Sequence, residues 1–171
     1  RLYVFGAGHV GRALSKFASE SGFDVFLIDE RKIEMDKMAP GKTNKLLLPY
    51  KELLSRLPFG KRTYIAIMTR DHAMDREILA FCLQKERTYL GMIGSKRKVE
   101  VTRKMFLSGG ICTEAEFDRT DTPMGIDIKA HSPEEIAISI LAKMISVKND
   151  HAHFFSNTII RTLNRHEDIE T

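Results

Sequence analysis

The stretch Leu2-Tyr3-Val4-Phe5-Gly6-Ala7-Gly8-His9-Val10-Gly11 decides the fold of this chain. Four apolar residues typical of a buried strand lead directly into a G-x-G-x-x-G turn, and a helical pattern begins at Val10. In such a turn Gly6 permits the tight bend, Gly8 lets a pyrophosphate approach the backbone, and Gly11 lets the helix pack closely on the strand. The free N–H groups and the positive dipole end of the helix favour an anion there. The stretch therefore predicts a Rossmann-type phosphate site.

An acidic residue closes the next strand. Asp29 stands 18 residues after Gly11, at the end of an apolar run, and a carboxylate at this point can accept both hydroxyl hydrogens of a ribose. The guanidinium of Arg31 could instead meet a 2′-phosphate or pair with Asp29, so the sequence leaves the choice of nucleotide open. His9, inside the glycine turn, is expected either to contact the ligand or to cover the turn.

Apolar strand-like runs alternate with helical patterns along the rest of the chain. We expect strands at residues 2–5, 25–28, 45–48, 64–68 and 89–93, and helices at 10–21, 72–85, 95–107 and 133–148. Such alternation predicts an α/β fold, a Rossmann-like doubly wound and mostly parallel sheet with helices on both faces, plus a C-terminal helix. Ser132, Pro133 and Glu135 mark the start of the last long helix as a capping box.

Two domain-level segments follow from this pattern. Residues 1–148 are expected to form a Rossmann-like cofactor-binding domain, and residues 149–171 a helical tail. Within the tail, apolar residues from His151 to Leu163 have helical spacing, which predicts a further helix after Asn149-Asp150. That helix would dock on a second copy of the chain, giving a homodimer, or on its own domain.

Two later strand ends carry polar residues that suit the same ligand. In Thr69-Arg70-Asp71-His72, Thr69 or Asp71 either caps the next helix or faces the ligand, while His72 is a first-turn surface residue or an acid, base or ligand contact. The next strand end gathers a glycine, a capping serine and three cations, namely Gly94, Ser95, Lys96, Arg97 and Lys98. Because the carboxyl ends of parallel strands share one edge, we expect the three loops to surround one phosphate-bearing ligand.

Composition excludes several classes of protein. The net charge of +4 is too small for a general nucleic-acid binder, and no apolar run approaches the roughly 20 residues of a membrane-spanning helix. Cys82 is expected in the core and Cys112 at the surface, and neither has a partner at metal-ligand spacing. We therefore expect no metal site and no catalytic residue, and the reducing cytoplasm is the expected compartment.

Five blocks of sequence, taken in order, resemble the Rossmann domain of the XdhC/CoxI family, the accessory proteins that mature molybdenum hydroxylases such as xanthine dehydrogenase. The blocks lie within residues 2–148 and comprise Phe5–Gly11, Thr69–His72, Gly91–Lys98, Pro123–Ile128 and Ser132–Ala137. Where the family commonly has a glycine after an Asp-Ile step, this chain has Lys129. Longer members carry an N-terminal domain with a cysteine-glycine motif, which we expect to be absent here.

The resemblance implies a carrier rather than an enzyme. Such a protein binds the molybdenum cofactor (molybdopterin), assists its sulfuration and passes it to the apo molybdenum hydroxylase. A cysteine desulfurase is a further partner that the resemblance implies. Molybdopterin bears a phosphate, so the start of the first helix and the cations from Lys96 to Lys98 have a chemically sensible target.

Two other functions are compatible with the residues. An NAD(P)-dependent oxidoreductase would use the same glycine turn, but 171 residues leave little room for a substrate domain, and no Tyr/Lys or His/Asp catalytic pair stands out. Hydride transfer with any substrate would favour this function. A nucleotide-sensing Rossmann module would change its oligomeric state with nucleotide and have no affinity for a pterin.

Overall fold

The computed structural model describes residues 1–167, with the side chains of residues 1–150. In this part of the chain a five-stranded parallel sheet has the strand order β3-β2-β1-β4-β5. Its strands are β1 (Leu2–Phe5), β2 (Val25–Asp29), β3 (Asn44–Leu47), β4 (Tyr64–Ile67) and β5 (Tyr89–Met92). The order reverses between β1 and β4, and the crevice beyond the carboxyl ends at such a switch point is where open α/β sheets bind ligands.

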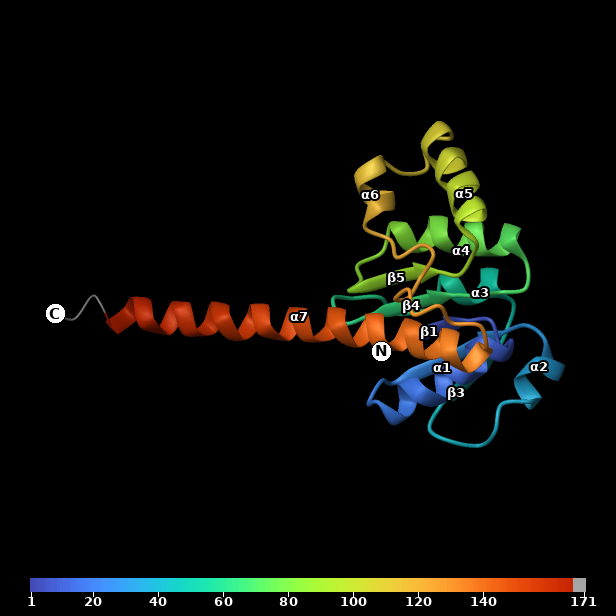
Figure 1. Ribbon diagram of the computed structural model, residues 1–171, viewed down its shortest axis with the longest axis horizontal. Helices are drawn as coiled ribbons and strands as arrows, with labels where there is room; N and C mark the ends of the chain where they lie inside the picture. The colour runs from blue at the N-terminus through green and yellow to red at the C-terminus, as the bar shows by residue number, and fades with distance from the viewer. Residues whose placement is uncertain (168–171) are drawn as a thin grey trace.

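Helices cover both faces of the sheet. They are α1 (His9–Glu20), α2 (Lys32–Asp36), α3 (Tyr50–Leu54), α4 (His72–Leu83), α5 (Lys96–Ser108), α6 (Glu114–Asp118) and α7 (Pro133–Glu167). Figure 1 shows α1 and α7 on one side of the sheet and α4, α5 and α6 on the other. The predicted doubly wound α/β fold is confirmed.

The central strand explains why its sequence is an unbroken apolar run. Leu2 and Val4 belong to the core cluster beneath α1 and α7, whereas Tyr3 and Phe5 belong to the cluster beneath α3 to α6. All four side chains are at most 1% exposed. Because successive side chains of a strand point to opposite faces, a strand covered on both sides must be apolar at every position.

The start of α7 confirms the predicted capping box. Glu135 accepts hydrogen bonds from the backbone N–H groups of His131 and Ser132 at 2.7 and 3.1 Å, and the Ser132 hydroxyl accepts one from Glu135 at 3.2 Å. One turn later α7 buries Ala137, Ile140, Leu141 and Met144 against α1.

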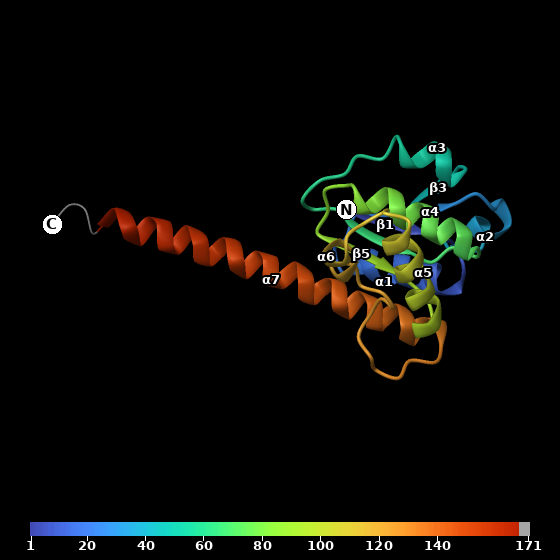
Figure 2. The same cartoon turned by 90° about the horizontal axis from the view of Figure 1, so that it is seen from above.

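The helix end expected at residue 148 is wrong. α7 runs without interruption to Glu167. Asn149 and Asp150 lower the helix propensity without ending a helix, and no glycine or proline stops the helix there. Figure 2 shows the helix continuing away from the sheet. The side chains of the expected tail helix, 151–163, lie outside the described ones. No helix among the described residues is long and apolar enough to cross a membrane.

Three short helices and one cysteine differ from expectation. α2, α3 and α6 are five residues long each, too short for a helical period to be recognised. Cys112, expected at the surface, is only 9% exposed because it packs in the cluster that contains Phe106 and Phe117. Cys82 is fully buried, as expected.

Candidate functional site

The three glycines of the first turn are required for different reasons. Gly6 has a φ of 115°, and a Cβ there would lie 2.3 Å from the carbonyl oxygen of Met68. A Cβ at Gly11 would lie 1.8 Å from the carbonyl oxygen of Gly6. Gly8, by contrast, has a φ of −65°, and its Cβ would meet no atom within 4 Å. The fold therefore needs Gly6 and Gly11, while the backbone at Gly8 faces open space.

The helix that starts at this turn has no side-chain cap. Gly8 caps α1 with no side-chain hydrogen bond, and the first turn of α1 holds no acidic residue. The helices that follow β4 and β5 do have caps, since Asp71 accepts from the N–H of Ala73 at 2.9 Å and Ser95 accepts from that of Lys98 at 3.4 Å. An uncapped helix start presents N–H donors and a positive dipole end, which suits an anion.

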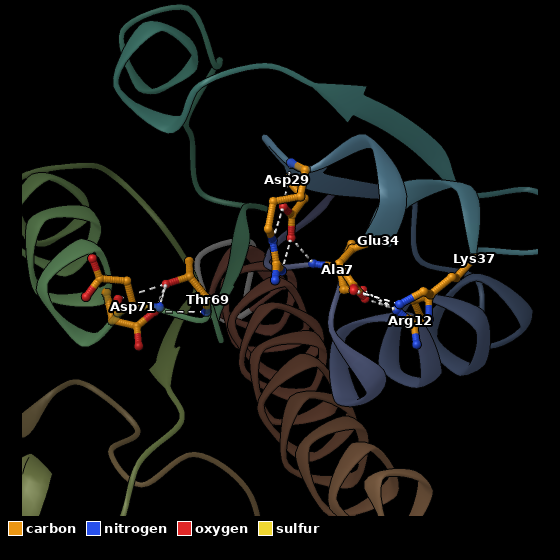
Figure 3. A network of polar contacts seen from close by, with 9 residues as sticks. Ala7, Arg12, Asp29, Glu34, Lys37, Thr69 and Asp71 are labelled. Carbon is orange, nitrogen blue, oxygen red and sulfur yellow. Dashed lines mark hydrogen bonds and ion pairs between the residues drawn. The ribbon is translucent and has the colours of Figure 1, made fainter.

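The acid at the end of β2 is already engaged (Figure 3). One oxygen of Asp29 accepts from the backbone N–H and Nε of Arg31, both at 2.9 Å, and the other accepts from the N–H of Ala7 and from Nη2 of Arg31, both at 2.7 Å. Burial alone would raise the pKa of Asp29, but these hydrogen bonds and the Arg31 charge lower it overall. Arg31 was expected either to meet a 2′-phosphate or to pair with Asp29, and in the structure it pairs with Asp29.

A second ion-pair network holds the glycine turn in place. The Arg12 guanidinium donates to the carbonyl oxygen of Ala7 at 2.6 Å and to Glu34 at 2.8 Å, and Lys37 contacts the other oxygen of Glu34 at 2.7 Å. The network ties α1 and α2 to the turn. Nothing in the sequence pattern indicated it, because Arg12 and Glu34 read as ordinary surface charges of two helices.

At the end of β4, a buried acid connects two of the predicted loops. The N–H and hydroxyl of Thr69 lie 2.9 and 2.7 Å from one oxygen of Asp75, which is fully buried. The other oxygen lies 3.3 Å from Nδ1 of His72, and Nε2 of the same ring contacts the ammonium of Lys98. Burial raises the pKa of Asp75 despite these contacts. Sequence reasoning missed Asp75, which carried no motif signal.

Eight of the predicted site residues line three cavities. One, of about 560 Å³, is lined by Glu30, Arg31, Tyr50, Thr69, Arg70, Asp71, His72 and Met74. A second, of about 430 Å³ between α4 and α5, is lined by His72, Arg76, Met92, Ile93, Ser95, Arg97, Lys98, Val101 and Thr102. His72 is common to both. His9 lines a third cavity, of about 470 Å³, on the side of α1.

The structure brings the second loop against both of the others, since the backbone of Gly6 packs on Met68 and Thr69 and the side chain of His72 contacts Lys98. Thr69, Asp71 and His72 share a cavity with Arg31, and His72 meets Ser95, Arg97 and Lys98 in the next. The remaining predicted residues line none of the three cavities, namely Gly6, Gly8, Val10, Gly11, Asp29, Gly94 and Lys96. The β1 and β5 ends are separated only by β4, which places these two strand ends roughly 10 Å apart at the sheet edge. In the described part of the chain, no three His, Cys, Asp or Glu side chains gather as a metal site would require.

Comparison with known proteins identifies relatives of this chain. The family described as the XdhC Rossmann domain matches residues 2–144. The uncharacterized protein YqeB of Escherichia coli (strain K12) is 31% identical over 152 residues, covering 88% of this chain and 28% of that protein. A probable xanthine dehydrogenase subunit of Bacillus subtilis (strain 168) is 29% identical over 149 residues, covering 86% and 43% of the two chains.

A solved structure agrees with these matches. The crystal structure described as a xanthine dehydrogenase from Bacillus halodurans superposes with a TM-score of 0.75 at 31% sequence identity, covering 88% of this chain and 43% of that one. The present chain thus spans less than half the length of each of these relatives. Together with the parallel sheet and the glycine turn, the match over residues 2–144 shows that this chain belongs to the XdhC Rossmann-domain family.

Proposed function

We propose that this domain binds the molybdenum cofactor and acts, as an accessory factor rather than an enzyme, in the maturation of a molybdenum hydroxylase of the xanthine dehydrogenase type. Family membership and the names of the Bacillus subtilis and Bacillus halodurans relatives support this kind of client. The observation that carries the proposal is the open space at Gly8, directly before the uncapped start of α1.

The residues present fit a phosphate-bearing ligand. A Cβ at Gly8 would occupy free space that no protein atom needs, so a glycine there serves an incoming group rather than the fold. The first N–H groups of α1 supply donors, and Arg97 and Lys98 supply positive charge from the α4–α5 cavity. The bound cofactor would provide redox chemistry to the client, and the domain would hold its phosphate and shield it until transfer.

The fit to a nicotinamide dinucleotide is poorer. Adenosine ribose binding in Rossmann folds uses a free carboxylate at the end of the second strand, and Asp29 is fully buried with each oxygen accepting two hydrogen bonds. A ribose could reach this carboxylate only after displacing the Arg31 guanidinium. For this reason NAD(P) is the weaker candidate ligand, and hydride transfer the weaker candidate function.

The same proposal covers the later steps of maturation. Assistance with sulfuration, exchange with a cysteine desulfurase and transfer to the apo-hydroxylase would all begin from cofactor bound at this edge of the sheet. The relatives are more than twice as long as this chain, so these steps can involve protein segments beyond those described. Homodimerisation belongs to the proposal as well.

A reconstitution experiment tests the accessory role. The purified chain is loaded anaerobically with molybdenum cofactor and mixed with apo-hydroxylase, and the recovery of hydroxylase activity is followed. We expect the loaded wild-type chain to restore activity faster than free cofactor, and Gly8→Val to bring no advantage because its side chain fills the space at the turn. The exposed substitution Lys104→Met is the matched control. Equal recovery with wild type, Gly8→Val and free cofactor would refute the accessory role.

A further inference from the structure

Asp75 is a buried acid without a role in the proposed function. Asp75 is fully buried. Only one of its two carboxylate oxygens accepts hydrogen bonds, and both of these bonds come from Thr69. The second oxygen has no hydrogen-bond partner that meets the usual geometry, although Nδ1 of His72 lies 3.3 Å away. Burying a carboxylate oxygen that has only one polar neighbour costs free energy, unless the oxygen has a role in orienting that neighbour.

The His72 side chain links α4 to a different helix, α5. His72 opens α4, and its Nε2 contacts the ammonium of Lys98 in the first turn of α5. Three side chains thus form a chain from the buried acid, through the imidazole, to a cation at the cavity between α4 and α5. We propose that Asp75 is a positioning residue which, through His72, fixes the Lys98 ammonium in the wall of this cavity and so prepares an oxyanion site there.

The tautomer of His72 carries the argument. An ammonium has only hydrogens to donate, so the imidazole nitrogen that Lys98 contacts must supply a lone pair. In the neutral ring the other nitrogen, Nδ1, then bears the hydrogen, and it lies 3.3 Å from the free oxygen of Asp75. A buried carboxylate can only accept, and therefore it selects this tautomer and no other.

The cavity beside Lys98 has the composition of an anion site with an apolar wall. Arg76 and Arg97 line it together with Lys98, and Met92, Ile93 and Val101 provide the apolar surface. Among the described side chains, no carboxylate lies within ion-pair distance of Arg76 or Arg97. Cations without internal partners are free to bind an external oxyanion, and a volume of about 430 Å³ suits a small ligand.

An incoming oxyanion would take Lys98 at little cost. Lys98 contacts a ring nitrogen rather than a carboxylate, so it can exchange the imidazole lone pair for a phosphoryl oxygen without leaving a buried charge unpaired. The ligand class is a phosphate or pyrophosphate group carried by a compact molecule. Its identity as the molybdenum cofactor rests on the proposed function, whereas the roles of Asp75 and His72 do not.

The first test reads the tautomer directly. In nitrogen-15 spectra of the neutral imidazoles, with the His72 signals assigned by their loss in His72→Gln, the wild type should show hydrogen on Nδ1. Asp75→Asn should move it to Nε2, because Thr69 keeps the amide oxygen and the amide NH2 then faces Nδ1. Lys98→Met should leave it on Nδ1. A wild-type ring with hydrogen on Nε2, or a flip caused by Lys98→Met alone, would overturn the proposal.

The second test measures affinity for inorganic pyrophosphate by calorimetry at low salt. We expect Lys98→Met to weaken binding about tenfold and Asp75→Asn about threefold or more, with the double variant no weaker than Lys98→Met alone. The control is Lys104→Met, whose lysine lies on the same helix but pairs with Glu100 at 3.7 Å. Independent, additive losses for Asp75→Asn and Lys98→Met would overturn the proposal, as would an unchanged affinity in Lys98→Met.

The two tests separate this inference from the proposed function. If the tautomer and pyrophosphate results are as expected but molybdenum cofactor fails to bind, only the identity of the ligand is wrong. If the cofactor binds and Asp75→Asn leaves the His72 tautomer unchanged, the positioning role of Asp75 is wrong and the proposed function stands.

Discussion

Arg31 holds both oxygens of Asp29 from two residues away, with Nε donating at 2.9 Å and Nη2 at 2.7 Å. Asp29 occupies the position whose carboxylate hydrogen-bonds the ribose in dinucleotide-binding Rossmann folds. In this chain the position is closed by an internal ion pair, while the phosphate position at Gly8 is open. Of the two features typical of a dinucleotide-binding turn, the space at Gly8 is thus open, whereas the acid at the end of β2 has an internal partner.

Removing the guanidinium should reopen the ribose position. We expect Arg31→Ala to increase affinity for NAD(H) measurably, because the Asp29 carboxylate loses the group that covers it. The variant should also lose about 1 kcal/mol of stability, a modest loss since the Arg31 side chain is 32% exposed. Titration with NAD(H) and urea unfolding measure the two effects, with Lys32→Ala as control. An NAD(H) affinity that falls in Arg31→Ala would contradict this interpretation.

The buried acids Asp29 and Asp75 should affect stability with opposite pH dependence. Hydrogen bonds hold the pKa of Asp29 below its ordinary value of 3.8, so its contribution is present at neutral pH and is lost as the pH falls through the folded pKa. Burial raises the pKa of Asp75, so its favourable contribution is complete below about pH 3.8 and is lost as the pH rises through the folded pKa.

Two amide variants make this difference measurable. Asp29→Asn should cost about 3 kcal/mol at pH 7, because an amide NH2 would face existing donors. Asp75→Asn should be neutral or stabilising at pH 7 and lose that advantage as the pH approaches 4. Urea unfolding at pH 7, 5 and 4 follows both trends. The prediction fails if Asp75→Asn becomes relatively more stable on acidification.

The cations from Lys96 to Lys98 should bind a phosphorylated ligand more tightly than its dephosphorylated form. Replacing Lys96 and Arg97 together by Ala should weaken a phosphorylated pterin more than its dephosphorylated form, and added salt should reduce the difference. Since Arg97 lines the α4–α5 cavity and Lys96 does not, Arg97→Ala alone should account for most of the loss. Equal losses of affinity for both pterins would mean that these cations do not contact the phosphate of the ligand.

Lys129 adopts a conformation that favours glycine. Its φ is 59°, in the left-handed region, where the family commonly has a glycine. Because a Cβ is unfavourable in this conformation, Lys129→Gly should stabilise the domain by about 0.5–1 kcal/mol. The exposed ion pair that it removes, to Asp127 at 2.7 Å, contributes little. Thermal unfolding measures the gain, and a lower melting temperature than wild type would show that the conformation is not strained.

Much of the fold was predictable because its strands are short apolar runs between helical patterns. The five strand predictions lie within one residue of the observed bounds at each end. The continuation of α7 through Asn149-Asp150 was not, since weak helix formers lower a propensity without ending a helix. Caps at Asp71 and Ser95 were visible because a capping side chain is local to its helix.

The site was predictable only as far as its residues act locally. Whether Asp29 is free or paired depends on the rotamer of Arg31, which no sequence pattern specifies. Asp75 gave no signal, because an acid in the first turn of a helix is normally a solvated one. In the structure Thr69 and His72 contact its two oxygens, and the sequence does not specify that these side chains turn toward the acid.

The most direct test of the account is a side-by-side titration of the wild-type chain and Gly8→Val with molybdenum cofactor, NAD(H), NADP(H) and simple nucleotides. We predict that molybdenum cofactor binds tightest to the wild type, and that Gly8→Val loses this affinity while its unfolding free energy changes little. Gly11→Ala should instead lose about 3 kcal/mol of stability, because its Cβ would collide with Gly6. Unchanged cofactor affinity in a folded Gly8→Val, or tighter binding of NAD(P)H than of the cofactor, would contradict the account.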